Sequence, residues 1–267
     1  EIQYTTVRSI TVDSSQMIWT GTWGDGMAEL RFPDGNPGNP NAPYKWIYYR
    51  QNNSAMTNNT VKVIKEETGG SKWIGTEDGL VLMEKIADFG DGGVKWKSFF
   101  SYNSGLPNNK VYNIAIDGFN NKWIGTFGGG LAKFDGTNWT IYDIKNSGLP
   151  DNYIISLVAD NNNMVWIGTY SGGLARFDGT AWKVFKTSNS KLPNNLVYSM
   201  AVDKNNNLWV GTLNNGLAKF DGKVWATFDI MDSGLPYTVS SIAIDKQGNK
   251  WIGTGGGLAV FNENGIK

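Results

Sequence analysis

The sequence predicts an all-β protein, a six-bladed β-propeller of four-stranded antiparallel blades. The tetrapeptide Trp-Ile-Gly-Thr, or a close variant, recurs six times, and an apolar residue stands twelve positions before each of its tryptophans. Asn, Gly and Asp-Gly turn signals separate short apolar runs within each repeat. Repeated four-stranded units of about 40–50 residues are typical of propellers. The tetrapeptides begin at Trp19, Trp73, Trp123, Trp166, Trp209 and Trp251.

The third repeat illustrates how each unit supplies its strands, which we name a to d. The β-branched run "VYNIAID" forms strand a, and "KWIGT" forms strand b after the polar turn "GFNN". Strand c is "GLAKF" and strand d is "NWTIY", with an Asp-Gly hairpin signal between them. No sustained helical period is present, and Gly interrupts every candidate helix. A β-solenoid is the weaker alternative, because solenoids usually have shorter periods and fewer strands per coil.

The six repeats fill nearly the whole chain, which we expect to form one domain over 1–267. Loop insertions lengthen the first two units, at "RFPDGNPGNPNAP" and "IADFGDGG". The sixth unit has no strand d tryptophan, so we expect an incomplete last blade with an exposed strand c edge at "GLAVF". Either the ring closes with a shortened last blade, or the chain is part of a longer protein. The expected blades are 7–52, 59–102, 109–145, 152–188, 195–230 and 237–267.

Most aromatic and acidic repeat positions are expected to be structural. Eleven of the twelve tryptophans recur in strands b or d, where a large ring can pack against the adjoining blade. Only Trp23 lies outside this register. An acidic residue also recurs six positions after the start of strand a, where its carboxylate can fix the a–b turn. These acids are Asp13, Glu67, Asp117, Asp160, Asp203 and Asp245.

Composition excludes several classes of function. Lys and Arg total 24 and so do Asp and Glu, so the chain lacks the basic surface of a nucleic-acid binder. It contains neither Cys nor His, which removes thiolate chemistry, the commonest general base and the commonest metal ligand. The Asn-rich turns lack the alternating ligands of a calcium loop. No apolar run is long enough to cross a membrane. We therefore expect no metal, no cofactor and no membrane insertion.

The stretch "LPNNKVYNIAIDGFNNKWIGTFGGGLAKFD" resembles the two-component regulator propeller repeat, and similar stretches recur in all six units. "LP" is missing before the first two. The resemblance implies an extracytoplasmic, bacterial protein, periplasmic or at the cell surface. Propellers of this family form sensor regions of hybrid histidine kinases, often in systems that respond to glycans. This chain departs from that pattern in having six units and no kinase or connector domain.

Variable residues follow each "GT", in the loop between strands b and c. In a propeller these b–c loops share one face with the d–a loops, around the mouth of the central channel. Rigid scaffolds often present binding groups on such loops, and aromatic rings beside carboxylates and amides suit sugars or peptides. The candidate ligand-binding residues are Trp23, Asp25, Glu77, Asp78, Phe127, Tyr170, Ser171, Leu213 and Asn214, with Trp23 as the leading anchor. The alternative is that the sequences of these loop tips vary because no structural or binding requirement constrains them.

Three functions remain open at this point. The first is a non-catalytic module that binds or senses a glycan or peptide. The second is a structural scaffold whose partner is another protein domain or chain. The third is a polysaccharide-cleaving enzyme that uses Asp25, Glu77 and Asp78, since two carboxylates can suffice for that chemistry. The sequence contains no activated nucleophile, so we expect no enzyme.

Overall fold

A computed structural model describes residues 6–32, 43–85, 93–228, 238–262 and 265–266. The described residues contain strands and turns but no helix. The described residues form six sheets, each with its four strands in sequence order and with antiparallel pairing between neighbouring strands. The prediction of an all-β, six-bladed propeller is confirmed.

The chain divides into two compact units. Unit 1 comprises residues 1–114 and 137–139, and unit 2 comprises residues 115–136 and 140–267. Blades 1 and 2 lie in unit 1, blades 4 to 6 lie in unit 2, and the boundary runs through blade 3. A single domain over 1–267 stays a prediction.

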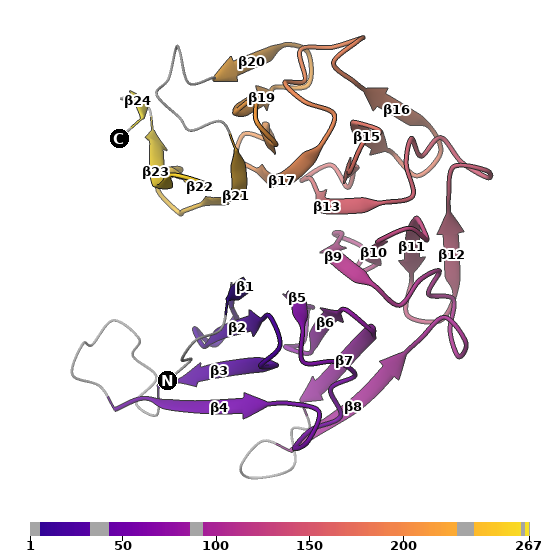
Figure 1. Ribbon diagram of the computed structural model, residues 1–267, viewed down its shortest axis with the longest axis vertical. Coiled ribbons are helices and arrows are strands. Elements are labelled where there is room, and N and C mark those ends of the chain that lie inside the picture. Colours follow the sequence, from indigo (N-terminus) through magenta and orange to yellow (C-terminus); the bar gives the residue numbers. More distant parts are fainter. Residues whose placement is uncertain (1–5, 33–42, 86–92, 229–237, 263–264, 267) are drawn as a thin grey trace. The chain divides into compact units, whose positions relative to one another are not determined.

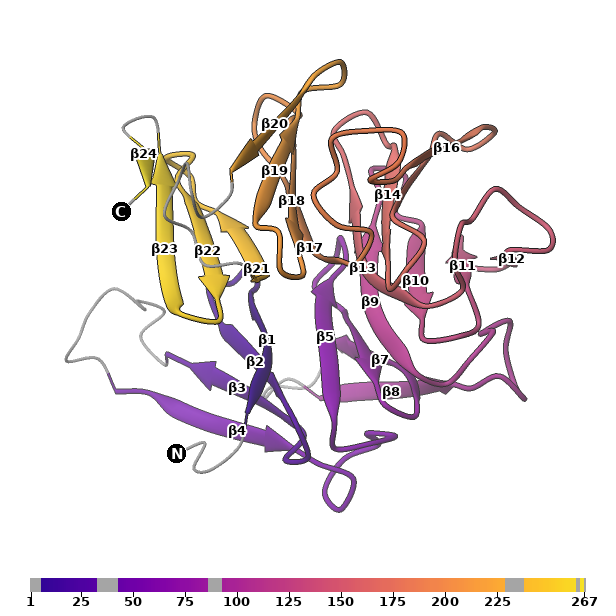
Figure 2. The ribbon, with the colours of Figure 1, turned by 45° about the horizontal axis from the view of Figure 1, so that its top comes forward.

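In unit 1, the first strands β1 and β5 each form one edge of their sheet, and the fourth strands β4 and β8 form the opposite edge (Figure 2). The strands of blade 1 are β1 (Val7–Val12), β2 (Ile18–Thr22), β3 (Met27–Arg31) and β4 (Lys45–Tyr49). Those of blade 2 are β5 (Val61–Glu66), β6 (Lys72–Thr76), β7 (Gly79–Lys85) and β8 (Val94–Phe99).

Blade 3, which the unit boundary crosses, consists of β9 (Val111–Ile116), β10 (Lys122–Thr126), β11 (Leu131–Phe134) and β12 (Trp139–Tyr142). Blade 4 consists of β13 (Ile154–Ala159), β14 (Val165–Thr169), β15 (Leu174–Phe177) and β16 (Trp182–Phe185). Blade 5 consists of β17 (Val197–Val202), β18 (Leu208–Thr212), β19 (Leu217–Phe220) and β20 (Trp225–Phe228). Blade 6 consists of β21 (Val239–Ile244), β22 (Lys250–Thr254), β23 (Gly257–Asn262) and β24 (Gly265–Ile266).

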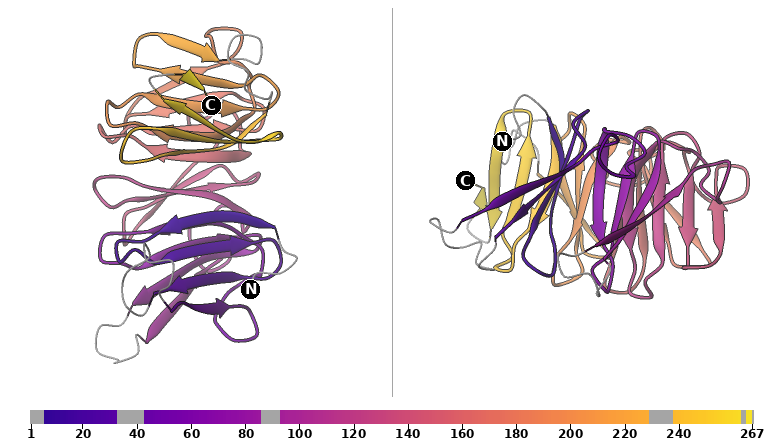
Figure 3. Two further views of the ribbon diagram at one scale, coloured as in Figure 1. Left: turned by 90° about the vertical axis from the view of Figure 1, so that its left-hand side faces the viewer. Right: turned by 90° about the horizontal axis from the view of Figure 1, so that it is seen from below.

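Within unit 2, the first strands β13, β17 and β21 each form one edge of their sheet, and the fourth strands β16 and β20 form the opposite edge (Figure 1). The strands run between two ends of the unit, with hairpin loops at both ends (Figure 3). Strand β17 contacts both β13 and β21, so consecutive blades meet through their first strands. The b–c loops therefore extend from the same end of each sheet.

Four of the strand b tryptophans join consecutive blades, as the sequence predicts, whereas Trp251 of the last blade is 40% exposed. Trp19 belongs to a core cluster that otherwise includes Val61, Ile64 and Ile74 of the next blade. In unit 2, Trp166 is 4% exposed and packs with residues of blade 5 that include Val197 and Phe220. In the same way, Trp123 packs against residues of blade 4, and Trp209 packs against residues of blade 6. Burial of these rings removes apolar surface from water and supplies most of the cohesion between blades.

The glycine of each "GT" sets how closely two blades approach. A Cβ at Gly211 would lie 2.4 Å from Cγ1 of Val239 in the next blade and 2.6 Å from Oγ of Ser199. Gly168 meets the next blade's Val197 in the same way, at 2.6 Å. The repeat requires glycine at this position because no side chain fits between the two sheets.

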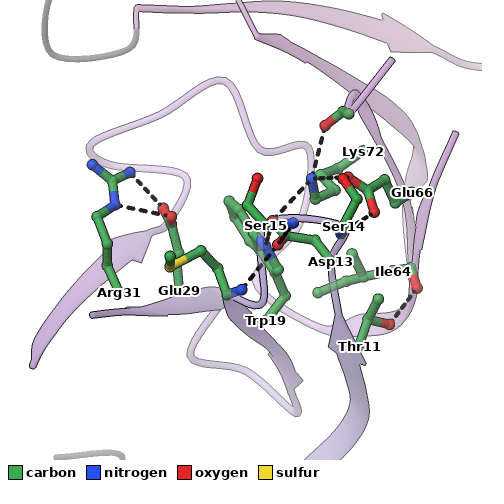
Figure 4. A network of polar contacts seen from close by, with 12 residues as sticks. Thr11, Asp13, Ser14, Ser15, Trp19, Glu29, Arg31, Ile64, Glu66 and Lys72 are labelled. Carbon is green, nitrogen blue, oxygen red and sulfur yellow. Dashed lines mark hydrogen bonds and ion pairs between the residues drawn. The ribbon is translucent and has the colours of Figure 1, made fainter. Parts of the chain in front are cut away.

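The a–b turn is fixed by the predicted acid together with the strand b tryptophan. In blade 1, Asp13 Oδ1 accepts hydrogen bonds from the backbone N–H groups of Ser15 and Met17, both at 2.9 Å. Its Oδ2 accepts one from Trp19 Nε1 at 2.8 Å, and Lys72 Nζ lies 3.3 Å away (Figure 4). Four further blades repeat the Trp–Asp bond, at Asp117, Asp160, Asp203 and Asp245. The acid is thus a turn device, as predicted.

Blade 6 ends in a very short fourth strand. Strand β24 pairs with β23 at two positions, Phe261 with Ile266 and Asn262 with Gly265. The incomplete last blade is therefore confirmed, while one residue of the "GLAVF" edge, Phe261, is paired. The loop insertions predicted in blades 1 and 2 lie mostly outside the described residues.

Candidate functional site

The b–c loops and the d–a loops share one end of each sheet, which we call the loop face. In blades 1 to 4, backbone hydrogen bonds link the b–c loop to the segment that precedes strand a of the next blade. In unit 1, Gly24 N–H donates to Asn59 O at 3.2 Å, and Gly79 N–H donates to Asn109 O at 2.7 Å. In unit 2, Gly128 and Gly173 repeat these contacts with the carbonyls of Asn152 and Asn195.

The same asparagines hold the d–a loops with their side chains. The Oδ1 atom of Asn109 accepts a hydrogen bond from Ser101 N–H, and that of Asn152 accepts one from Ile144 N–H. One residue therefore ties two loops together, which explains the asparagine that recurs two positions before strand a. Side chains on the loop face consequently start from a backbone that is already ordered, which lowers the entropic cost of binding.

In unit 1, the structure brings Trp23 and Glu77 together through Lys62. The Nζ atom of Lys62 lies 4.0 Å from the Trp23 ring centroid and 2.9 Å from Oε2 of Glu77. It also lies 4.7 Å from the Tyr112 ring centroid. Arg8 Cζ lies 4.5 Å from the Trp23 centroid, and Lys110 Nζ lies 3.4 Å from Oε1 of Glu77.

We call this group the Trp23 cluster; its members are Arg8, Trp23, Lys62, Glu77, Lys110 and Tyr112. The Trp23 residue is 50% exposed, whereas the Lys62 side chain is only 7% exposed. Burial alone would raise the pKa of Glu77, but the ammonium groups of Lys62 and Lys110 outweigh it and hold that pKa below its usual value. Glu77 is therefore an ionised partner of two lysines and is unsuited to act as a general acid.

A β-bulge in each strand a positions two members of the cluster. In β1, Val7 pairs with Thr22 and Ser9 pairs with Gly21, so Arg8 is an extra residue without a partner in β2. Lys62 is the equivalent extra residue between Val61 and Val63 in β5. Such bulges commonly redirect a side chain next to a functional site. Sequence reasoning missed these residues, although the position after the first residue of strand a varies among repeats.

The other two unit 1 candidates serve the loops. Asp25 forms a two-point ion pair with Arg50, with Nε–Oδ1 and Nη2–Oδ2 distances of 2.7 and 2.9 Å. This pair links the b–c loop of blade 1 to the end of its fourth strand. Asp78 accepts a hydrogen bond from Asn109 Nδ2 at 3.0 Å. The three carboxylates proposed for catalysis thus have separate cationic or amide partners.

In unit 2, the loop face carries an aromatic group. The rings of Phe127 and Tyr153 meet edge to face with centroids 4.8 Å apart, and those of Phe127 and Tyr170 do so at 6.2 Å. Tyr153 and Tyr170 are 45% and 52% exposed. Tyr170 N–H also donates to Tyr153 O at 2.9 Å, which fixes the two residues relative to each other. We call Phe127, Tyr153 and Tyr170 the aromatic group; the sequence analysis missed Tyr153, which directly precedes strand a.

The remaining unit 2 candidates lie on the same type of loop. Ser171 donates from its backbone N–H and its Oγ–H to Oδ2 of Asp151, at 2.9 and 2.8 Å. Leu213 is half-buried, and its backbone N–H donates a hydrogen bond to Leu196 O at 3.2 Å. Asn214 is exposed, has a φ of 66° and accepts a hydrogen bond from Thr238 Oγ1 at 3.2 Å.

The described residues contain no cluster of three or more acidic side chains that could hold a metal ion. They also include no helix with the length and apolarity needed to cross a bilayer. The loop face of unit 1 offers aromatic rings, amides and ion pairs, and that of unit 2 offers aromatic rings and amides.

Comparison with known proteins identifies the repeat. The family described as "Two component regulator propeller" matches residues 148–171 and 191–214. No curated protein sequence matches the chain. The extracellular domain of BT3049 from B. thetaiotaomicron, described as a hybrid two component system, is 24% identical with a TM-score of 0.80; the alignment covers 97% of this chain and 34% of that one.

Two further solved structures are similar over nearly the whole chain. PorZ of Porphyromonas gingivalis, a surface component of the type-IX secretion system, is 21% identical with a TM-score of 0.66, covering 95% of this chain and 38% of PorZ. An inactive virginiamycin B lyase from Staphylococcus aureus is 14% identical with a TM-score of 0.73, covering 100% of this chain and 84% of the lyase. These identities establish the fold alone.

The chain is thus a β-propeller, and two of its repeats, at residues 148–171 and 191–214, match the two-component regulator propeller family, as the repeated motif predicts. It is similar to extracellular domains of bacterial regulators and spans about a third of the length of the BT3049 extracellular domain.

Proposed function

We propose that this chain is a non-catalytic propeller of a bacterial extracytoplasmic protein that binds or senses a glycan or peptide at its loop face. The observation that carries the proposal is the aromatic group of unit 2. Two half-exposed tyrosines flank Phe127 on a backbone held by inter-loop hydrogen bonds. Exposed rings on an ordered backbone can stack on the apolar faces of sugars at low entropic cost.

Polar groups adjoin these rings and would provide hydrogen bonds to a ligand. Ser171 and Asp151 lie next to Tyr170 and Tyr153 in the sequence and are bonded to each other. A ligand hydroxyl could bond to this pair while its carbon face contacts a ring. The similarity to extracellular regulator domains supports a location in the periplasm or at the cell surface.

Three observations favour binding over catalysis. Asp25, Glu77 and Asp78 each have a structural partner, and the lowered pKa of Glu77 removes it as a proton donor near neutral pH. The inactive form of virginiamycin B lyase is a histidine-to-alanine variant, whereas this chain contains no histidine. The lyase chemistry therefore does not transfer with the fold.

The test is a glycan and peptide array, followed by incubation of the binding ligands with the protein and analysis of products. The proposal expects selective binding and unchanged ligand. New reducing ends or shortened chains would show an enzyme instead. Absence of binding to every glycan and peptide would leave the scaffold function, with another protein domain or chain as partner.

A further inference from the structure

The Trp23 cluster combines more positive charge than its own carboxylate neutralises. The cluster contains three cationic side chains and a single carboxylate: Lys62 and Lys110 pair with Glu77, while Arg8 lies over the Trp23 ring. Glu77 lies closest to the nearly buried Lys62 and reaches Lys110 at a longer distance. Among the described residues, Arg8 has no carboxylate within ion-pair distance. The cluster therefore presents unneutralised positive charge on the loop face.

The Arg8 guanidinium is placed to meet a ligand. The bulge in β1 removes Arg8 from the pairing with β2, and its guanidinium lies over the Trp23 ring. Stacking on an indole orders the planar guanidinium while leaving its N–H donors at the edges. A guanidinium held in this way can bind a carboxylate through two parallel hydrogen bonds.

The local backbone favours a saccharide over an extended peptide. Peptides that add to a sheet need unpaired backbone N–H and C=O groups. Here the b–c loop N–H groups of Gly26, Glu77 and Gly79 already donate to Asn59, Thr60 and Asn109. Side chains must then make the contacts, and the half-exposed Trp23 indole together with the Asp78–Asn109 pair suits a sugar ring and its hydroxyls.

We infer that the Trp23 cluster is a subsite for the carboxylate of an acidic saccharide, such as a uronic acid residue. The carboxylate bonds to Arg8, with Lys110 contributing long-range attraction, and Lys62 and Glu77 hold the arrangement in place. This inference rests on the proposed function and narrows its ligand class.

The test uses oligosaccharides of galacturonic acid and the same oligosaccharides as methyl esters, which lack the negative charge and carry one added methyl group per esterified residue. Isothermal titration calorimetry measures both against the wild-type protein, Arg8→Gln and Arg8→Lys. Lys97→Gln is the matched control, because Lys97 is an exposed cation whose Nζ lies 5.0 Å from the Phe99 ring on the outer strand β8.

We expect the acid form to bind at least about tenfold tighter than the ester, and Arg8→Gln to remove about that factor. Arg8→Lys should retain part of the affinity because it keeps the charge but loses the two-point geometry. Lys97→Gln should leave the affinity unchanged. Added salt should weaken binding of the acid more than that of the ester.

Equal binding of acid and ester, or an effect of Lys97→Gln as large as that of Arg8→Gln, would overturn the subsite. The proposed function would survive that result if neutral ligands still bound. Tighter binding of acidic peptides than of the uronates would overturn the saccharide assignment. Failure of all array ligands and both oligosaccharides to bind would overturn the inference and the proposed function together.

Discussion

Trp209 donates a hydrogen bond from its indole Nε1 to Oδ2 of Asp203 over 3.0 Å, and the Trp209 residue is only 2% exposed. The same carboxylate accepts hydrogen bonds from the backbone N–H groups of Asn205 and Asn207 at 3.0 and 2.9 Å. One side chain therefore joins the a–b turn to the ring that packs against the next blade. The hydrogen bond and the packing of the ring support each other.

Replacement of Asp203 by Ala should lower the free energy of unfolding by about 1–3 kcal/mol, because it leaves a buried indole N–H and turn amides without their acceptor. Urea unfolding measures the change. Asp203→Asn, which keeps one oxygen acceptor, should cost less. Equal stability of the Ala variant and the wild type would show that the bond contributes nothing to folding.

The turn carboxylates should also make stability depend on acid pH. Burial acts to raise the pKa values of Asp13 and Asp203, but hydrogen bonds from Trp19 and Trp209 and from turn amides outweigh it and lower them below 3.8. A lowered folded-state pKa contributes stability that is fully present above the unfolded-state pKa. That contribution is lost as pH falls below about 4 and through the folded-state pKa.

Urea unfolding over a series of pH values from neutral to below 4 tests this dependence. The free energy of unfolding should fall at the acid end, and the fall should be shallower for Asp203→Asn, which cannot titrate. Identical acid profiles for the variant and the wild type would contradict the assignment for Asp203.

Gly211→Ala should destabilise the protein by about 1–3 kcal/mol, because the added methyl group would overlap Val239 of the next blade. Gly255→Ala is the control: Gly255 directly follows the "GT" pair of blade 6, and its Cβ would meet nothing within 4 Å. Thermal unfolding of both variants measures the difference. Equal melting temperatures would contradict close contact between blades 5 and 6.

Trp166→Ala should cost about 3–5 kcal/mol, since the ring is buried between blades 4 and 5. The control is Val224→Ala on an outer hairpin, where the valine is 65% exposed and the loss should be small. Chemical denaturation of both variants provides the comparison. A loss below about 1 kcal/mol for Trp166→Ala would remove this ring from the core.

The sequence predicts the fold well because every repeat must form the same turns and pack against its neighbour in the same way. The roles of the repeated tryptophans, glycines and turn acids follow from these requirements, and the structure confirms them at Trp166, Gly211 and Asp203. The short β24 was harder to foresee, since only two residue pairs form it.

The candidate site was only partly predictable. The variable residue after "GT" pointed to Trp23, Phe127 and Tyr170, but their neighbours depend on contacts between blades. Arg8 and Lys62 reach the loop face because of a bulge, which the sequence pattern does not reveal. The one sequence signal for these residues is that the second position of strand a varies among the repeats, as the b–c loops do.

Tyr44 provides a control at the end of blade 1 opposite the b–c loop. It is 66% exposed and directly precedes β4, whereas the b–c and d–a loops lie at the other end of the sheet.

The most direct test of ligand binding at the loop face is the dissociation constant of the strongest array ligand for the wild type, Tyr170→Ala and Tyr44→Ala. Each variant removes one exposed tyrosine, so the two differ mainly in position. The account predicts a loss of about 1–2 kcal/mol, roughly five- to thirtyfold in Kd, for Tyr170→Ala and no change for Tyr44→Ala. Weaker binding by Tyr44→Ala with Tyr170→Ala unchanged would contradict the account and place the ligand away from the loop face.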